Sequence, residues 1–128
     1  MIRQRPRPLL LTLLAGLLAG IGQAHADGDA AHGKQIFETC NICHSNQPGE
    51  VKLGPSLFGV VGRKAGSVPG FHYTPGVQKL SNDVTWTPDQ IFKWLADPSK
   101  MAAGTAMSFN LPAEKDRQDV IAYLETLK

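Results

Sequence analysis

The stretch from 46 to 76 restricts the fold of this chain more than any other feature, because four prolines and seven glycines interrupt every regular period in it. Proline breaks helices and cannot donate a hydrogen bond to a sheet, and glycine loses much conformational entropy when it is ordered. We therefore expect a long loop here. A loop of this length in a compact domain argues against a core built from protein side chains alone. We expect another component to complete the interior.

Short helices are predicted on both sides of the loop. Residues 29–39 are expected to form a helix that Asp29 caps. A second helix is predicted to start after Thr87, which can cap it, with Pro88 at the first helical position and Gln90 completing a capping box.

The second helix is expected to end near Asp97, because Pro98 follows. Residues 99–112 read as irregular, and Pro112 is predicted to open a last helix that runs to about residue 127. Apolar residues recur in this last helix at helical spacing, at Val120, Ile121, Leu124 and Leu127. Three short helices with long loops cannot bury much apolar area, which again points to a missing component.

The N-terminus has the pattern of a secretory signal peptide. Residues 1–8 carry three arginines, residues 9–21 are almost wholly apolar, and small residues at 24 and 26 predict cleavage after Ala26. The alternative is a membrane anchor, but the apolar run is shorter than the ~20 residues that span a bilayer. Since no two arginines are adjacent, the general secretory route is favoured over the twin-arginine route. Residues 27–128 are then the mature domain, expected in the periplasm.

The charge of the predicted mature domain excludes some partners. Three of the 13 basic residues belong to the leader, so residues 27–128 hold 10 Lys and Arg against 11 Asp and Glu. A nearly neutral domain is a poor ligand for nucleic acid or for an anionic membrane. An exported chain also meets an oxidising compartment, where cysteines can form disulfides.

The two cysteines of the chain, Cys40 and Cys43, lie one helical turn apart, and His44 follows directly. A disulfide suits the expected compartment, but a thioredoxin-like redox pair needs a strand–helix context that the sequence lacks. A zinc site normally needs a second cysteine pair. Only the third interpretation explains the histidine: C-x-x-C-H is the attachment sequence for c-type haem. We therefore predict one covalent haem c, which would also fill the interior.

Beyond this motif, residues 29–128 resemble the class I c-type cytochromes, segment by segment and in order. The segments are "GKQIFETCNICH", "LGPSLFGVVGRKAG", "PGFHYTPGV", "TWTPDQIFKWLADPSKMAAGTAMSF" and "RQDVIAYLETLK". The resemblance implies an all-α cytochrome c fold, with three to five short helices and long loops wrapped around one covalent haem.

The resemblance also implies the two axial ligands of the haem iron, which are His44 and Met107. "AAGTAM" matches the methionine loop of the family, although Ala103 replaces its proline and Ala106 its lysine. With both axial positions occupied, no site is left for a substrate, so the chain is expected to carry electrons rather than to be an enzyme. The alternative ligands are Met101, read as a packing residue, and His32 and His72, read as polar surface groups.

Further residues of the haem environment follow from the resemblance. The carbonyl of Pro55 is expected to accept the ring N–H of His44, and Gly54 to let the backbone approach the haem. Trp94 stands where the family often has a tyrosine near the methionine sulfur, and its indole N–H can still donate a hydrogen bond. The other matches are Arg63, Tyr73 and Trp86 at the buried propionate, Thr105 and Asn82 more weakly, Phe109 at the exposed haem edge, and Gly33, Phe37, Tyr123 and Leu124 at a helix–helix contact.

Partners are expected to be redox proteins that bind transiently: a quinol–cytochrome c reductase or dehydrogenase as donor, and a terminal oxidase or other acceptor. Mitochondrial relatives ring the haem edge with lysines that steer acidic partners. Here only Lys52, Lys100 and Lys115 match that ring. We therefore expect partner binding to depend less on salt than it does for a strongly basic cytochrome. The alternatives are a subunit bound to one enzyme and a ligand-binding or peroxidase-like haem protein with an open iron.

Overall fold

The structure is a computed structural model that describes residues 28–128, so the predicted leader and its cleavage site lie outside the described residues. It contains five helices: α1 (Ala30–Cys40), α2 (Pro75–Leu80), α3 (Pro88–Ala96), α4 (Pro98–Met101) and α5 (Glu114–Leu124). Between residues 28 and 128, the only β-type pairing is an isolated antiparallel bridge between Lys64 and Thr85. The predicted all-α fold of three to five short helices is confirmed. No helix in this part of the chain is long and apolar enough to cross a membrane.

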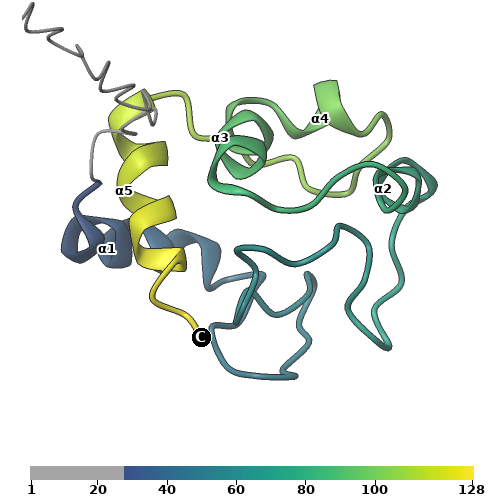
Figure 1. The fold of residues 1–128 in the computed structure, drawn as a ribbon, viewed down its shortest axis with the longest axis horizontal. Coiled ribbons are helices and arrows are strands. Elements are labelled where there is room, and N and C mark those ends of the chain that lie inside the picture. The colour runs from purple at the N-terminus through teal and green to yellow at the C-terminus, as the bar shows by residue number, and fades with distance from the viewer. Residues whose placement is uncertain (1–27) are drawn as a thin grey trace, which may run out of the picture.

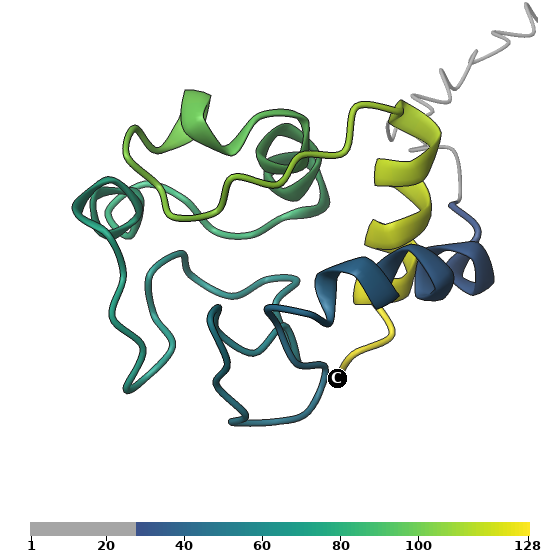
Figure 2. The same ribbon diagram turned by 180° about the vertical axis from the view of Figure 1, so that it is seen from behind.

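Helices α1 and α5 cross in close contact, as both views show (Figures 1 and 2). Gly33 makes this crossing possible, since a Cβ at this position would lie 1.9 Å from the carbonyl oxygen of Asp119. Phe37 packs on Tyr123 with ring centroids 5.2 Å apart. The predicted helix–helix contact is therefore confirmed, and it anchors a core to which α3 adds Ile91 and Leu95.

The predicted helix starts are also confirmed. The carboxylate of Asp29 accepts hydrogen bonds from the backbone N–H groups of Ala31 (2.9 Å) and His32 (3.1 Å) at the start of α1. The hydroxyl of Thr87 accepts one from Gln90 N–H (3.3 Å) at the start of α3. Both interactions satisfy N–H groups that the first turn of a helix leaves free.

Two regions predicted as loops contain short helices. Helix α2 starts at Pro75, inside the expected loop. Helix α4 starts at Pro98 and overlaps the beginning of the stretch 99–112, which was predicted to be irregular. Both prolines were read as helix breakers, yet each occupies the first helical turn, where its missing N–H costs nothing. The carboxylate of Asp97 also caps α4 by accepting the N–H of Ser99 (3.1 Å).

The last helix begins two residues later than predicted, at Glu114 rather than Pro112. The guanidinium of Arg117 donates to the carbonyls of Leu111 (2.7 Å) and Pro112 (2.8 Å). These bonds keep the backbone at Leu111 and Pro112 in a non-helical conformation just before α5. Between α1 and α2, residues 41–74 form the predicted long loop, which passes below α2 and α3 in Figure 1.

Candidate functional site

A cavity of about 600 Å³ lies in the interior between the long loop, α3, α5 and the segment that follows α4. Its lining is mostly apolar, and it includes nine of the residues predicted for the haem site: Cys40, Cys43, His44, Pro55, Arg63, Tyr73, Trp86, Thr105 and Met107. The structure thus brings together residues that are spread over 68 positions of the sequence, from 40 to 107.

Cys40 is the last residue of α1, and the chain makes one further turn after it. The backbone N–H groups of Cys43 and His44 both donate to the carbonyl of Cys40, at 3.0 and 2.9 Å. This turn directs the two sulfurs and the imidazole toward one cavity. Burial raises the pKa of the Cys40 thiol to about 11, which disfavours the thiolate that a redox-active cysteine needs. Within residues 28–128, no three His, Cys, Asp or Glu residues gather as a metal site, so the zinc alternative has no support.

A hydrogen bond and a close backbone contact fix the orientation of the His44 ring. Its Nδ1–H donates to the carbonyl of Pro55 at 2.8 Å, as predicted, so Nε2 carries the free lone pair. Burial lowers the pKa of His44, which favours the neutral ring that can bind a metal. A Cβ on Gly54 would lie 2.3 Å from the ring, so Gly54 makes room for the imidazole itself. Gly54 also lines the cavity, so the close approach of its backbone to the haem stays a prediction.

Met107 is held by contacts of a different kind. The indole N–H of Trp94 donates to its sulfur at 3.2 Å, and the Thr105 hydroxyl accepts its backbone N–H at 3.3 Å. The Trp94 ring in turn packs edge-on against Trp86, with centroids 5.3 Å apart. A thioether sulfur has two lone pairs, so one remains for an iron ion after the indole has bound the other.

Two residues of the lining, Arg63 and Trp86, lie where two distant segments pair. Trp86 N–H donates to the carbonyl of Arg63 (2.8 Å), and Gly62 N–H donates to that of Trp86 (2.9 Å). The Arg63 guanidinium donates to the Phe58 carbonyl at 3.1 Å, and no carboxylate of residues 28–128 forms an ion pair with it. Burial lowers the pKa of Arg63, as expected for a cation that lacks a counter-charge.

Thr74 and Gly76 were not predicted from the sequence as residues of the site. The Thr74 hydroxyl is buried and lines the cavity without a hydrogen-bond partner in the described chain. Its place before Pro75 suggests a helix cap, but it makes no capping bond. Gly76 lets α2 approach the methionine loop, since a Cβ there would lie 2.3 Å from the carbonyl of Ala103. Only this three-dimensional contact reveals its role.

These features fit a haem. An unpaired guanidinium and an orphaned hydroxyl are buried groups that need an acceptor, and the propionates of haem are such acceptors. The apolar remainder of the lining suits the porphyrin ring, and imidazole nitrogen with thioether sulfur is a donor set that haem iron accepts. The residues present therefore match the group that the sequence motif predicts.

Four weaker candidates for the haem site, three of them alternative iron ligands, lie in different parts of the structure. Met101 and Asn82 lie outside the cavity lining, whereas His72 lines it from an exposed position. His32 is exposed, as predicted, and its Nδ1 also donates to the buried carboxylate of Asp119 at 2.8 Å. His32 therefore has a structural role between α1 and α5.

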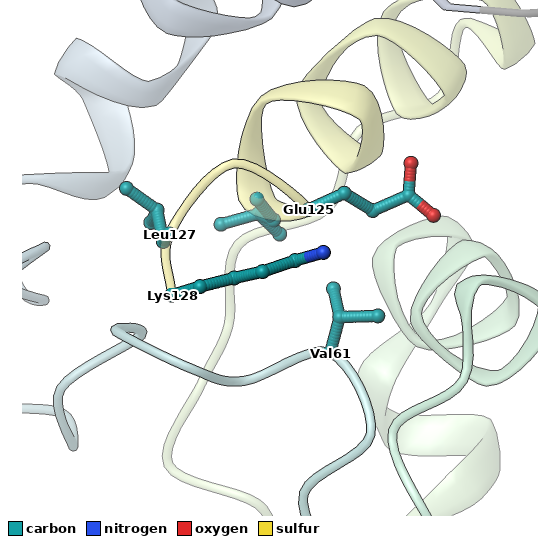
Figure 3. A pocket seen from close by; sticks show the side chains of 5 residues that line it. Val61, Glu125, Leu127 and Lys128 are labelled. Atoms are coloured by element: carbon teal, nitrogen blue, oxygen red, sulfur yellow. The ribbon is translucent and has the colours of Figure 1, made fainter.

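A second hollow, of about 410 Å³, lies beside the C-terminal end of α5 (Figure 3). Val61, Glu125, Leu127 and Lys128 line it, and Leu124 separates it from the main cavity by lining both. It contains no residue that binds iron or attaches a haem, so it is not part of the site.

Comparisons with known proteins agree with this description. The family model "Cytochrome c" matches residues 30–128. Cytochrome c2 of Rhodopila globiformis is 45% identical over 103 residues, which cover 79% of this chain and 95% of that protein. Cytochrome c of Euglena viridis is 43% identical over 103 residues, which cover 79% of this chain and 99% of that protein.

A solved structure shows the same fold. Ferricytochrome c2 from Rhodopseudomonas palustris superposes with a TM-score of 0.71 at 40% identity, over 78% of this chain and 99% of that one. Proteins of this kind carry one covalently attached c-type haem and transfer electrons rather than catalyse a reaction. The cavity, the cysteine motif and these relatives together show that the chain belongs to the cytochrome c family.

Proposed function

We propose that this chain is a periplasmic one-electron carrier whose haem is bound through Cys40 and Cys43 and ligated by His44 and Met107. Each thiol would add across one vinyl group, with sulfur on one carbon and hydrogen on the other, so that nothing is released. When bound, the haem supplies an iron that changes its charge by one electron. The carrier would take electrons from a quinol–cytochrome c reductase or dehydrogenase and pass them to a terminal oxidase or another acceptor.

One observation carries the proposal: both candidate iron ligands lie in one cavity, and the protein fixes each of them independently. Pro55 holds the imidazole of His44 at 2.8 Å, and Trp94 holds the sulfur of Met107 at 3.2 Å. Ligands that keep their places when the iron changes charge keep the reorganisation energy small. A soft thioether ligand and a buried site both favour the ferrous state, so a high reduction potential is expected.

The polar residues would act on the haem carboxylates. Arg63 would compensate their negative charge, and the Thr74 and Tyr73 hydroxyls would offer donors from the same part of the lining. Tyr73 already accepts the N–H of Val68 at 3.0 Å, which leaves its own hydroxyl hydrogen free to donate. These contacts would hold the cofactor and keep water away from its buried edge.

The ligation is tested by the absorbance spectrum of the purified ferric protein. A weak far-red band from sulfur-to-iron charge transfer is expected in the wild-type protein and absent from Met107→Ala, whereas Met101→Ala should retain it. The competing open-iron protein predicts a high-spin ferric spectrum and carbon monoxide binding by the native ferrous protein. Either of those results in the wild-type protein would reject Met107 as a ligand.

Export is a separate part of the proposal. It rests on the pattern of residues 1–26 and is supported by the bacterial cytochrome c2 relatives. The mass of the chain recovered from the periplasm should correspond to residues 27–128 plus one haem. A chain that retains the leader, or that co-purifies with one enzyme in fixed ratio, would instead favour an anchored or dedicated subunit.

A further inference from the structure

The exposed apolar side chains of the described chain are concentrated in one place. Three large apolar residues are exposed between residues 28 and 128, and all three lie in the 42–53 segment: Ile42 (73%), Val51 (45%) and Leu53 (81%). Ile42 and Leu53 also line the haem cavity, whereas Val51 does not. A side chain that lines a cavity and is still mostly exposed must lie at the opening of that cavity.

The rest of the opening carries no fixed charge. The exposed residues of the lining are Thr39, Ile42, Leu53, His72, Ala106 and Ser108, and we call this set the opening face. No Lys, Asp or Glu lines the cavity, and its one permanently charged residue is the half-buried Arg63. A face of this composition offers a partner apolar contact and hydrogen bonds rather than ion pairs.

None of the lysines expected to steer partners lines the cavity, although Lys52 is the sequence neighbour of Leu53. The ammonium group of Lys52 donates to the carbonyl of Asn41 at 2.7 Å, and that of Lys115 donates to the buried carboxylate of Asp119. Lys100 lies on α4, outside the lining. Glu38 is the sequence neighbour of Thr39, and Lys52 is that of Leu53, so one charge of each sign flanks these exposed residues in the sequence.

We propose that the opening face docks redox proteins through an uncharged, apolar patch centred on Ile42 and Leu53. The fitting partner has an apolar docking surface without a cluster of carboxylates. This inference rests on the proposed function, because it assumes that electrons pass through the cavity opening. Apolar contact is not screened by salt, whereas encounters between charged faces are.

A second copy of this chain has such a face and is therefore a defined probe. Electron self-exchange between ferrous and ferric copies transfers one electron and no proton, and line broadening in NMR spectra of mixed samples measures its rate constant. We expect the wild-type rate constant to change by less than about twofold between 10 and 500 mM NaCl. Leu53→Ser and Ile42→Ser should each lower it about fivefold or more, because burial of these side chains stabilises the encounter.

Val51→Ser is the matched control, since it removes an exposed apolar side chain that is close in sequence but outside the lining. Its rate constant should equal that of the wild type. Leu53→Lys should slow exchange strongly at low salt and recover partly at high salt, because two like charges then face each other. Equal losses in Val51→Ser and Leu53→Ser, no loss in Leu53→Ser, or a steep salt dependence of the wild type would each overturn the proposal.

Failure of the proposed function would look different. The far-red band and the reduction potential are measured first on every variant. If the wild type lacks the band or cannot be cycled between its two oxidation states, the electron-carrier proposal fails. If spectra and potentials are normal in all variants and only the pattern of rate constants disagrees, the docking proposal alone fails.

Discussion

The contact between α1 and α5, which we call the corner, and the haem cavity are stabilised in opposite ways. At the corner, protein groups satisfy one another: the carboxylate of Asp119, only 1% exposed, accepts bonds from Asp29 N–H, His32 and Lys115. In the cavity, the buried Thr74 hydroxyl lacks a partner and about 600 Å³ is enclosed by mostly apolar walls.

This difference shows which part of the fold the polypeptide specifies alone. Close-packed interiors contain few voids larger than a water molecule, so a cavity of this size is a place for another molecule. The corner follows ordinary rules of helix packing, with a glycine at the crossing and aromatic rings beside it. Substitutions that disturb one of the two regions therefore show whether the other depends on it.

The largest effect is expected when the haem cannot be attached. In Cys40→Ala/Cys43→Ala, the cavity walls would lose the group they pack against, and a domain of about 100 residues with little core of its own would not remain folded. We expect most of the far-UV circular dichroism signal of the helices to be lost. A mass spectrum without added haem, combined with native-like helix content, would contradict the dependence of the cavity half on its cofactor.

The second largest effect is expected from Gly33→Ala, which attacks the corner. The added methyl group would meet the carbonyl oxygen of Asp119 at 1.9 Å, a backbone atom that cannot rotate away. Separation of the two helices should cost about 3 kcal/mol of unfolding free energy, measured by denaturant titration of the haem-loaded protein. Gly70→Asn serves as the control, since its backbone φ of 77° suits asparagine and nothing lies within 4 Å of an added Cβ. Equal stability of Gly33→Ala and the wild type would disprove the close crossing.

The third effect concerns the charge at the same corner. Hydrogen bonds from Lys115 and then from His32 hold the pKa of Asp119 below its ordinary value of about 3.9. The folded state thus binds a proton less readily than the unfolded state. The stabilisation is complete above the ordinary pKa and is lost as the pH falls toward the lower pKa of the folded chain.

Asp119→Asn should therefore be less stable than the wild type at pH 7, and the difference should shrink between pH 5 and pH 2. Denaturation midpoints at several pH values measure it. Asp83→Asn, a change at an exposed carboxylate, should track the wild type throughout. A pH-independent difference would mean that the charge of Asp119 does not matter.

The same division explains what the sequence could predict. The helix caps at Asp29 and Thr87 depend on neighbours within a few residues, and they were predicted correctly. The cysteine–histidine motif is equally local, and the cofactor that it predicts is the one that the family carries. Helices α2 and α4 were missed because a proline stops or starts a helix according to the residues around it. Thr74 and Gly76 were missed because no local pattern encodes a buried hydroxyl without a partner in the described chain or a contact with a distant loop.

The smallest effect is expected from Trp94→Phe. This substitution alters the chemistry of the cavity and leaves the α1–α5 corner intact. The indole N–H withdraws electron density from the sulfur of Met107, so its removal makes the sulfur a better donor to ferric iron and should lower the reduction potential. A single hydrogen bond contributes about 0.5–1.5 kcal/mol, which limits the shift to roughly 20–60 mV for one electron. Phe92→Leu, at a side chain outside the cavity lining that contacts Arg117, is a control that should leave the potential unchanged. A normal potential in Trp94→Phe would show that the indole only packs against Trp86, since a purely structural ring contact would survive the change to phenylalanine.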